Sequence, residues 1–322
     1  MNIISRAAEL VGQRSSMTFQ DPETKSSMRR DQHHHHTEAC TEACCDRPAK
    51  VAKASGLGDQ DSPLTHVVSP QGDESCLSCV TLTEAVLALK RPEVASCILP
   101  PSSEDAELAT LWKERIGTFP LFKLETTVKV RHGTDIRSAL RKSLVPMLPA
   151  ELKDPHGDDG EIMRATLGRL ERLVRDVMTA SLGAAVNGSK VRVRVESVDG
   201  VMCPKFHQDN VPLRACVTMA GETTDVLPES AVDREVIDAV DDGVTKPLPL
   251  EEYNDKVACG QAAEEVVLKP PLAGTLLMKG LKWTNAERKR PSAAVRHLAA
   301  VHRSPPDCGR RLLLAADVGS EA

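Results

Sequence analysis

Three residues of metal-binding type stand at positions that two β-strands can bring together. His207 and Asp209 are separated by one residue, and His302 lies far along the chain in the run His302-Arg-Ser-Pro305. Residues i and i+2 of an extended strand point to the same face, so His207 and Asp209 can reach one ion. Two imidazoles and one carboxylate leave open positions on an octahedral metal, as in non-heme Fe(II) sites that admit oxygen and a second substrate. The spacing predicts a metal centre at these three residues.

The same His-x-Asp pattern occurs a second time, so its context must decide. With ten histidines in the chain, on the order of one chance copy is expected at average Asp usage. His156 and Asp158 lie among Pro, Gly and Asp residues typical of a solvated turn. The copy at 207 lies between the alternating segment 191–198 and the apolar run 213–219, where strands are expected. We therefore place the site at the copy that contains His207.

His297 competes with His302 as the distant ligand. The two are five residues apart, and an odd separation puts them on opposite faces of a strand. His302 is favoured because Arg310 and Arg311 follow it before the apolar run 312–316. A guanidinium there can fork onto a carboxylate, and only one of the two arginines can face the site. Arg311 is favoured because it abuts the apolar run, and the alternative is two solvated arginines at a strand end.

Ordered motifs from about Arg164 to Asp317 resemble the family of domains of unknown function numbered 1826. The motifs are Cys203-Pro-Lys-Phe-His-Gln-Asp209, Arg214, Gly221 to Glu229, Leu277-Met-Lys-Gly280, Trp283, His302-Arg-Ser-Pro305 and Arg311-Leu-Leu-Leu314. Asp225 and Val226 depart from the Glu and Trp of the family pattern. The order of the motifs is also similar to that of the 2-oxoglutarate and Fe(II)-dependent oxygenases, where H-x-D, a distal His and an Arg or Lys follow one another.

This resemblance implies a fold, a cofactor pair and a reaction. The fold is α+β, a mostly antiparallel double-stranded β-helix of the jelly-roll or cupin-like kind, braced by N-terminal helices. His207, Asp209 and His302 would hold Fe(II), and Arg311 would be the catalytic residue that binds the far carboxylate of 2-oxoglutarate. Arg214 would bind an acidic group of the cofactor or substrate, or form a surface salt bridge. The implied activity is hydroxylation of a small molecule or protein.

A different class of function is compatible with the same ligands. In a non-catalytic protein of metal homeostasis they would hold Zn(II), and the polar segment with His33 to His36, Cys40, Cys44 and Cys45 would collect metal. In a third interpretation, metal binding is lost and the sheet binds a partner. Arg311 discriminates between the first two, because an oxygenase needs a cation for its cosubstrate and a zinc buffer does not.

Composition excludes several other classes. The formal net charge is −5 and aromatic residues make up 2% of the chain, which disfavours nucleic-acid binding by counterion release or base stacking. No apolar run approaches the roughly 20 residues of a membrane helix, and no apolar signal-peptide core is present. We expect a soluble protein, cytoplasmic or organellar and not secreted. The ten cysteines are expected to be thiols or metal ligands.

The elements that must position these residues follow from periodicity. Residues 1–75 are polar and predict a disordered His/Cys-containing tail, and 76–322 a single α+β domain. Within it, 76–185 is expected to be a helical support layer and 186–322 the β-rich metal-binding core. Helices are predicted at 82–90, 104–116, 135–144 and 161–182. Strands are predicted at 191–198, 213–219, 264–269, 275–279, 297–302 and 311–316, with a less regular region over 225–257.

Overall fold

Two sheets of unequal size organise the described part of the chain. The computed structural model describes residues 73–153, 157–181, 190–241, 248–283, 299–306 and 308–319. The large sheet has seven strands in the order β1-β2-β7-β5-β9-β4-β3, and the small one pairs β6 with β8. β1 and β2 are parallel, and the other pairs are antiparallel. The strands are β1 (Cys76–Ser78), β2 (Ser96–Leu99), β3 (Phe122–Lys129), β4 (Lys190–Val198), β5 (Leu213–Ala220), β6 (Asp225–Leu227), β7 (Thr275–Lys279), β8 (Val301–Arg303) and β9 (Arg311–Val318).

Helices α2, α3 and α4 begin where polar side chains accept hydrogen bonds from their first free backbone N–H groups. Thr81 and Glu84 form a capping box at α2, Ser102 accepts from the Asp105 N–H at α3, and Asp135 accepts from the Ser138 N–H at α4. The helices are α2 (Leu82–Leu89), α3 (Ser103–Arg115), α4 (Ile136–Leu144), α5 (Asp158–Ala180), α6 (Arg234–Asp241), α7 (Leu250–Val257) and α8 (Ala263–Val266). The four predicted helices are confirmed to within a few residues.

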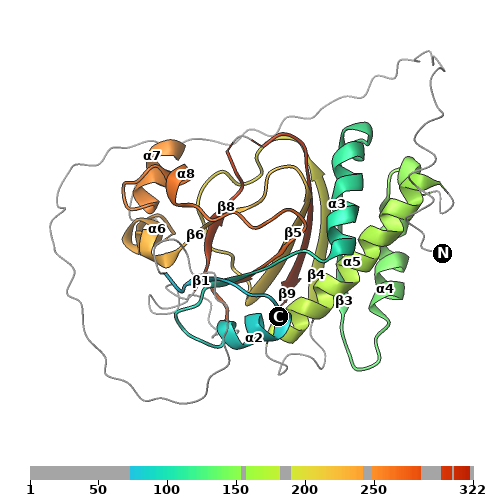
Figure 1. The fold of residues 1–322 in the computed structure, drawn as a ribbon, viewed down its shortest axis with the longest axis horizontal. Helices are drawn as coiled ribbons and strands as arrows, with labels where there is room; N and C mark the ends of the chain where they lie inside the picture. Colours follow the sequence, from blue (N-terminus) through green and yellow to red (C-terminus); the bar gives the residue numbers. More distant parts are fainter. Residues whose placement is uncertain are drawn as a thin grey trace, which may run out of the picture. The chain divides into compact units, whose positions relative to one another are not determined.

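One face of the large sheet is apolar and covered by helices. Figure 1 shows α3, α4 and α5 together on one side of this sheet. The fully buried side chains of α5, Leu170, Leu173 and Val177 among them, join a core with alternate residues of β4 and β9. The indole Nε1 of buried Trp112 donates to Thr166 Oγ1 at 2.8 Å, which ties α3 to α5. Because aromatic residues are scarce in this chain, Leu and Val supply most of this core.

A smaller core lies beside the two-stranded sheet. Buried side chains of α6, α7 and α8 form an apolar cluster that includes Phe206 and Val301. Figure 1 shows these three helices grouped near β6. Because Phe206 and Val301 immediately precede His207 and His302, this cluster fixes the two segments that carry the histidines.

The structure corrects some of the expected elements. Residues 263–266 form α8 rather than the strand predicted at 264–269, and Leu268 makes an isolated bridge to Val226. A short apolar run does not distinguish strand from helix by period alone, which explains the error. Segment 76–185 also supplies β1, β2 and β3, so it is not purely helical. The result is a mixed α+β fold with a large sheet.

Part of the predicted organisation lies outside the described residues. Residues 1–72 of the expected tail, with the His33 to His36 run and its cysteines, belong to that part, as do His156 and His297. Of the residues described, no helix is long and apolar enough to cross a membrane. Their cysteines are free thiols, as predicted.

Candidate metal centre

His207 and His302 occupy the same rung of an antiparallel pairing. The His207 N–H donates to the His302 carbonyl at 3.0 Å, and the His302 N–H donates to the His207 carbonyl at 3.1 Å. Residues paired in this way project their side chains to the same side. The two imidazole centroids are 4.4 Å apart. Backbone pairing between segments almost a hundred residues apart thus brings the two predicted ligands together.

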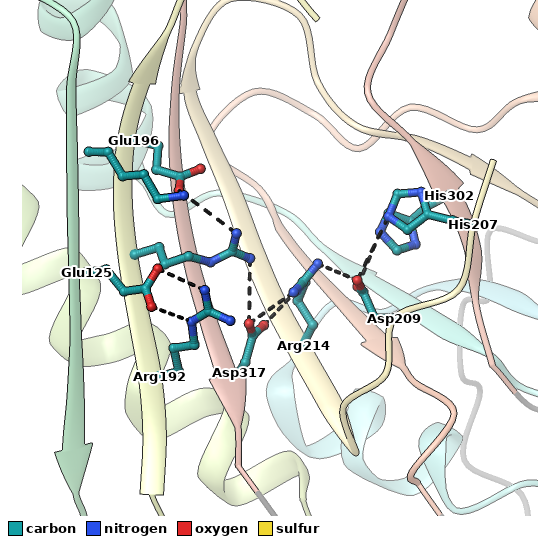
Figure 2. Close-up of polar contacts among 10 residues, drawn as sticks. Glu125, Arg192, Glu196, His207, Asp209, Arg214, His302 and Asp317 are labelled. Atoms are coloured by element: carbon teal, nitrogen blue, oxygen red, sulfur yellow. Dashed lines mark hydrogen bonds and ion pairs between the residues drawn. The ribbon is translucent and has the colours of Figure 1, made fainter. Parts of the chain in front are cut away.

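Asp209 completes the cluster from the same side as His207. Its Oδ2 lies 3.2 Å from His302 Nε2, and its Oδ1 lies 3.9 Å from His207 Nε2 (Figure 2). One ligand atom from each of the three residues lies within 4.8 Å of the others. Adjacent ligands of an octahedral metal, with bonds near 2 Å, are about 3 Å apart, so small side-chain shifts would close the set on one ion.

Unpartnered polar atoms support the fit of a metal. His302 Nδ1 is buried and has no hydrogen-bond partner among the described residues, and buried Asp209 Oδ2 has only the contact with His302 Nε2. Buried polar atoms are almost always hydrogen-bonded in native structures, and an ion is one explanation for an exception. The side chains of Asp209 and His302 are only 11% and 7% exposed, whereas His207 is 33% exposed. The open side of the cluster is therefore at His207.

The protonation states suit metal binding. Burial and the neighbouring His302 lower the pKa of His207 to about 4, so its imidazole is neutral at physiological pH. Its Nδ1 lies 2.9 Å from the Lys205 carbonyl, which can accept a hydrogen bond from Nδ1–H and so favours the tautomer with a free lone pair on Nε2. Burial alone would raise the pKa of Asp209, but His302 and Arg214 hold it below the ordinary value. The cluster thus presents a carboxylate and a free imidazole nitrogen.

Helix α7 holds the segment that leads to His207. Asn254 Oδ1 accepts from the Phe206 N–H at 3.0 Å, and Asn254 Nδ2 donates to the Pro204 carbonyl at 2.9 Å. Tyr253 Oη donates to the Phe206 carbonyl at 3.0 Å. Neither residue was predicted from the sequence, because a Tyr-Asn pair in an irregular region gives no signal of this role.

Gly280 lets the end of β7 pack against the backbone of Asp209. A Cβ at this position would lie 2.1 Å from the Val211 carbonyl oxygen and 2.7 Å from that of Asp209. The Leu281 N–H donates to the Asp209 carbonyl at 2.8 Å. This close approach gives a physical reason for the Lys-Gly motif noted in the sequence.

Arg214 is engaged on all three of its nitrogens. Nε and Nη2 donate to the two carboxylate oxygens of Asp317 at 2.6 and 3.0 Å, and Nη1 donates to Asp209 Oδ1 at 2.6 Å (Figure 2). Burial would lower its pKa, but the hydrogen bonds to Asp317 and attraction to Asp209 raise it. Arg214 is therefore not in a surface salt bridge, because its side chain is mostly buried. Its donors are already occupied by Asp317 and Asp209, so an anionic cofactor would have to displace these carboxylates to bind it as predicted.

Arg311 lies on the same face of the sheet as Arg214. Arg214 is the cross-strand partner of Asp317, and Arg311 stands an even number of residues from Asp317 on β9. Arg311 is 1% exposed, and its Nε and Nη2 have no hydrogen-bond partner among the described residues. Arg310 instead donates to the Gly117 and Phe119 carbonyls. Of the two arginines, Arg311 is the one available inside.

The chain is similar to one protein family in sequence and to several solved structures in fold. The model of the family described as "Protein of unknown function (DUF1826)" matches residues 105–317. No curated protein matches. The dioxygenase for auxin oxidation in rice is 10% identical, with 74% of this chain and 78% of that chain covered and a TM-score of 0.40. Dioxygenase for auxin oxidation 1 from Arabidopsis thaliana, with 2-oxoglutarate, is 11% identical, with coverages of 75% and 88% and a TM-score of 0.36. An oxidoreductase of the 2OG-Fe(II) oxygenase family from Burkholderia pseudomallei is 12% identical, with coverages of 75% and 91% and a TM-score of 0.35.

Proposed function

The chain belongs to the DUF1826 family of proteins of unknown function, and we propose that it is an Fe(II)- and 2-oxo-acid-dependent oxygenase of an organic substrate. The observation that carries the proposal is one combination of groups. A His-Asp-His cluster is hydrogen-bonded through Asp209 to Arg214, and Arg214 lies on the same face of the large sheet as a buried guanidinium, Arg311, that lacks hydrogen-bond partners among the described residues on two nitrogens.

The metal would be held by His207, Asp209 and His302. Two imidazoles and a carboxylate on one side of an ion leave positions for other ligands, the arrangement typical of non-heme Fe(II) oxygenases. When bound, Fe(II) would couple the reduction of O2, the oxidant, to the oxidative decarboxylation of the 2-oxo acid, so that one oxygen atom enters the acid, which loses CO2, and the other enters a substrate C–H bond. The protein contributes the neutral His207 ring, the ionised Asp209 and an enclosed setting for both.

Arg311 would bind the far carboxylate of the 2-oxo acid. A guanidinium matches a carboxylate with two parallel hydrogen bonds, and a buried one without an anion is costly. Asp317 lies on the same face of β9 as Arg311, and Arg214 donates to both Asp317 and Asp209. The metal-binding carboxylate is therefore tied to the sheet face that carries Arg311, as a cosubstrate that bridges the metal and Arg311 requires.

The finer fold assignment belongs to this proposal. We take the large sheet and the β6–β8 pair as the two sheets of a double-stranded β-helix, and 76–322 as one domain. The support is an apolar cluster between them: Val226 of β6 packs with Cys216, Leu276 and Ala315 of the large sheet. In a jelly-roll arrangement this space between the sheets is where small ligands bind.

The first experiment is metal analysis of the full chain with an anaerobic spectroscopic titration. Wild-type protein loaded with Fe(II) is expected to develop a visible absorption band when 2-oxoglutarate is added. His302→Ala is expected to bind no iron, because one of the three ligands is lost. Arg311→Met is expected to bind iron but to need at least about tenfold more 2-oxoglutarate, since the buried guanidinium that would pair with the cosubstrate carboxylate is removed.

Arg310→Met is the matched control. Arg310 is the neighbouring guanidinium, and its partners are the Gly117 and Phe119 carbonyls rather than the interior. The control should respond to 2-oxoglutarate as the wild type does. Iron binding without any response to a 2-oxo acid contradicts the oxygenase proposal, and tight Zn(II) with no response would favour the metal-homeostasis alternative. The buried Arg311 guanidinium favours the oxygenase, because zinc storage does not require it.

A further inference from the structure

Asp317 lies at the centre of a row of charged side chains that crosses four strands of the large sheet. On β9 it faces Arg214 of β5 on one side and Arg192 of β4 on the other. Arg194 Nη2 lies 3.5 Å from Asp317 Oδ2, and Arg192 itself forks onto Glu125 of β3 with two 2.8 Å hydrogen bonds. Figure 2 shows the row ending at the His-Asp-His cluster. Asp317 is 2% exposed, so this carboxylate is buried among arginines.

Arg214 gives more of its hydrogen bonds to Asp317 than to Asp209. Asp317 accepts from Nε and Nη2, which commits that edge of the guanidinium plane to one carboxylate. Nη1 is left, and it reaches only Oδ1 of Asp209. Asp209 Oδ2 receives no hydrogen bond from Arg214 and lies 3.2 Å from His302 Nε2. The oxygen that faces the imidazole thus stays clear of the guanidinium.

We propose that Asp317 is a positioning residue of the metal centre, which holds Arg214 so that Arg214 binds one oxygen of Asp209 and leaves the other for the metal. This inference rests on the proposed metal centre. Without Asp317, the Arg214 fork has a single carboxylate within reach, and a fork onto both oxygens of Asp209 is the strongest pairing available to it. A metal would then have to displace a guanidinium from Asp209.

The charge balance acts in the same direction. Arg214 is shared between Asp209 and Asp317, so these three groups carry one net negative charge, part of which Arg194 offsets from 3.5 Å. Neutralising Asp317 removes that charge and leaves Arg214 to Asp209 alone. Partners in the second layer around a metal typically change its affinity by about 10- to 100-fold when mutated. The effect expected for Asp317 lies in that range.

The test is a titration of the metal-free full chain with Co(II), followed by its visible absorption. Asp317→Asn is expected to raise the Kd for Co(II) by about 10- to 100-fold. Glu125→Gln is the matched control, because it removes a carboxylate from an arginine of the same row without touching Arg214. Its Kd should stay within about twofold of the wild type. Thermal melting of each metal-free variant reports whether the fold is kept.

Two further measurements separate positioning from a structural role. Arg214→Lys keeps one charge but cannot fork onto Asp317 and reach Asp209 together, so it should weaken Co(II) binding even with Asp317 intact. A crystal structure of metal-free Asp317→Asn should show Arg214 on both oxygens of Asp209. If Asp317→Asn melts lower yet binds Co(II) as the wild type does, the positioning role is overturned. Absence of Co(II) binding by the wild type would overturn the metal centre itself, and this role with it.

Discussion

The two faces of the large sheet are built from the same strands and do opposite things. On β9, Leu312, Leu314 and Ala316 point to the helices and are fully buried in the apolar core. The residues between them point to the other face, which carries Arg311 and Asp317. Side chains alternate across a strand, so each strand contributes to both faces. Fold stability is concentrated on one face and candidate chemistry on the other.

The difference shows how buried charge is tolerated in this protein. On the helix-covered face, buried Arg169 donates to Thr275 Oγ1 at 2.5 Å and lies 3.2 Å from Asp105, and buried Lys279 donates to the Arg91 carbonyl at 2.8 Å. On the other face, Arg311 keeps Nε and Nη2 without hydrogen-bond partners among the described residues. Unpartnered buried groups cost stability and are found where a ligand can repay them. The contrast therefore separates structural ion pairs from groups held ready for a ligand.

Truncation of the apolar face should produce the largest loss of stability. Leu314 is fully buried between β4 and β5, and Leu314→Ala is expected to lower the free energy of unfolding by about 2–5 kcal/mol. Urea denaturation measures the change. Leu313→Ala, next along the strand but pointing to the other face and only partly buried, should cost less. Equal losses would remove the distinction between the faces.

Removal of the Arg311 guanidinium should increase the free energy of unfolding, the opposite of the Leu314 truncation. Arg311→Met is expected to raise the stability of the metal-free protein by about 1–4 kcal/mol, since a buried charge is replaced by an apolar side chain of similar length. Arg310→Met should instead lower it, because hydrogen bonds to two carbonyls are lost. Both are read from urea denaturation of metal-free protein. A loss of stability in Arg311→Met would show that its guanidinium is structural.

The third prediction concerns Lys279 on the helix-covered face and the dependence of stability on pH. Its ammonium is buried, donates to the Arg91 carbonyl at 2.8 Å, and burial lowers its pKa to about 8 from 10.5. Between about pH 8 and about pH 10.5 the unfolded chain therefore binds more protons at this group. Stability contributed by Lys279 should rise with pH over that window, by on the order of 1–3 kcal/mol.

The measurement compares wild type with Lys279→Met, so that other groups titrating in the same range cancel. The difference in free energy of unfolding between the two proteins should change across the window. A constant difference would mean that Lys279 keeps an ordinary pKa and that this face tolerates a charge.

Much of the local structure could be read from the sequence. The helical period of 161–182 predicted α5, and the alternation of 191–198 predicted β4. The i, i+2 rule predicted that His207 and Asp209 point to the same side of an extended segment, and in the structure their ligand atoms lie together. These inferences succeed because side-chain direction along a helix or strand depends only on the backbone period. The strand predicted at 264–269 was wrong, since residues 263–266 form a helix. The reason is that a short apolar run is too short to show a helical or strand period.

The tertiary structure alone decided how these segments meet. The rung between His207 and His302 joins segments that no local pattern connects, and the Arg214 fork depends on Asp317 arriving from β9 beside β5. Asp317 looked like any charged residue at the end of an apolar strand. Strand order and register depend on which distant hydrophobic faces pack together, so cross-strand neighbours are fixed only when the whole sheet assembles. Which polar atoms are left without a partner follows from that assembly.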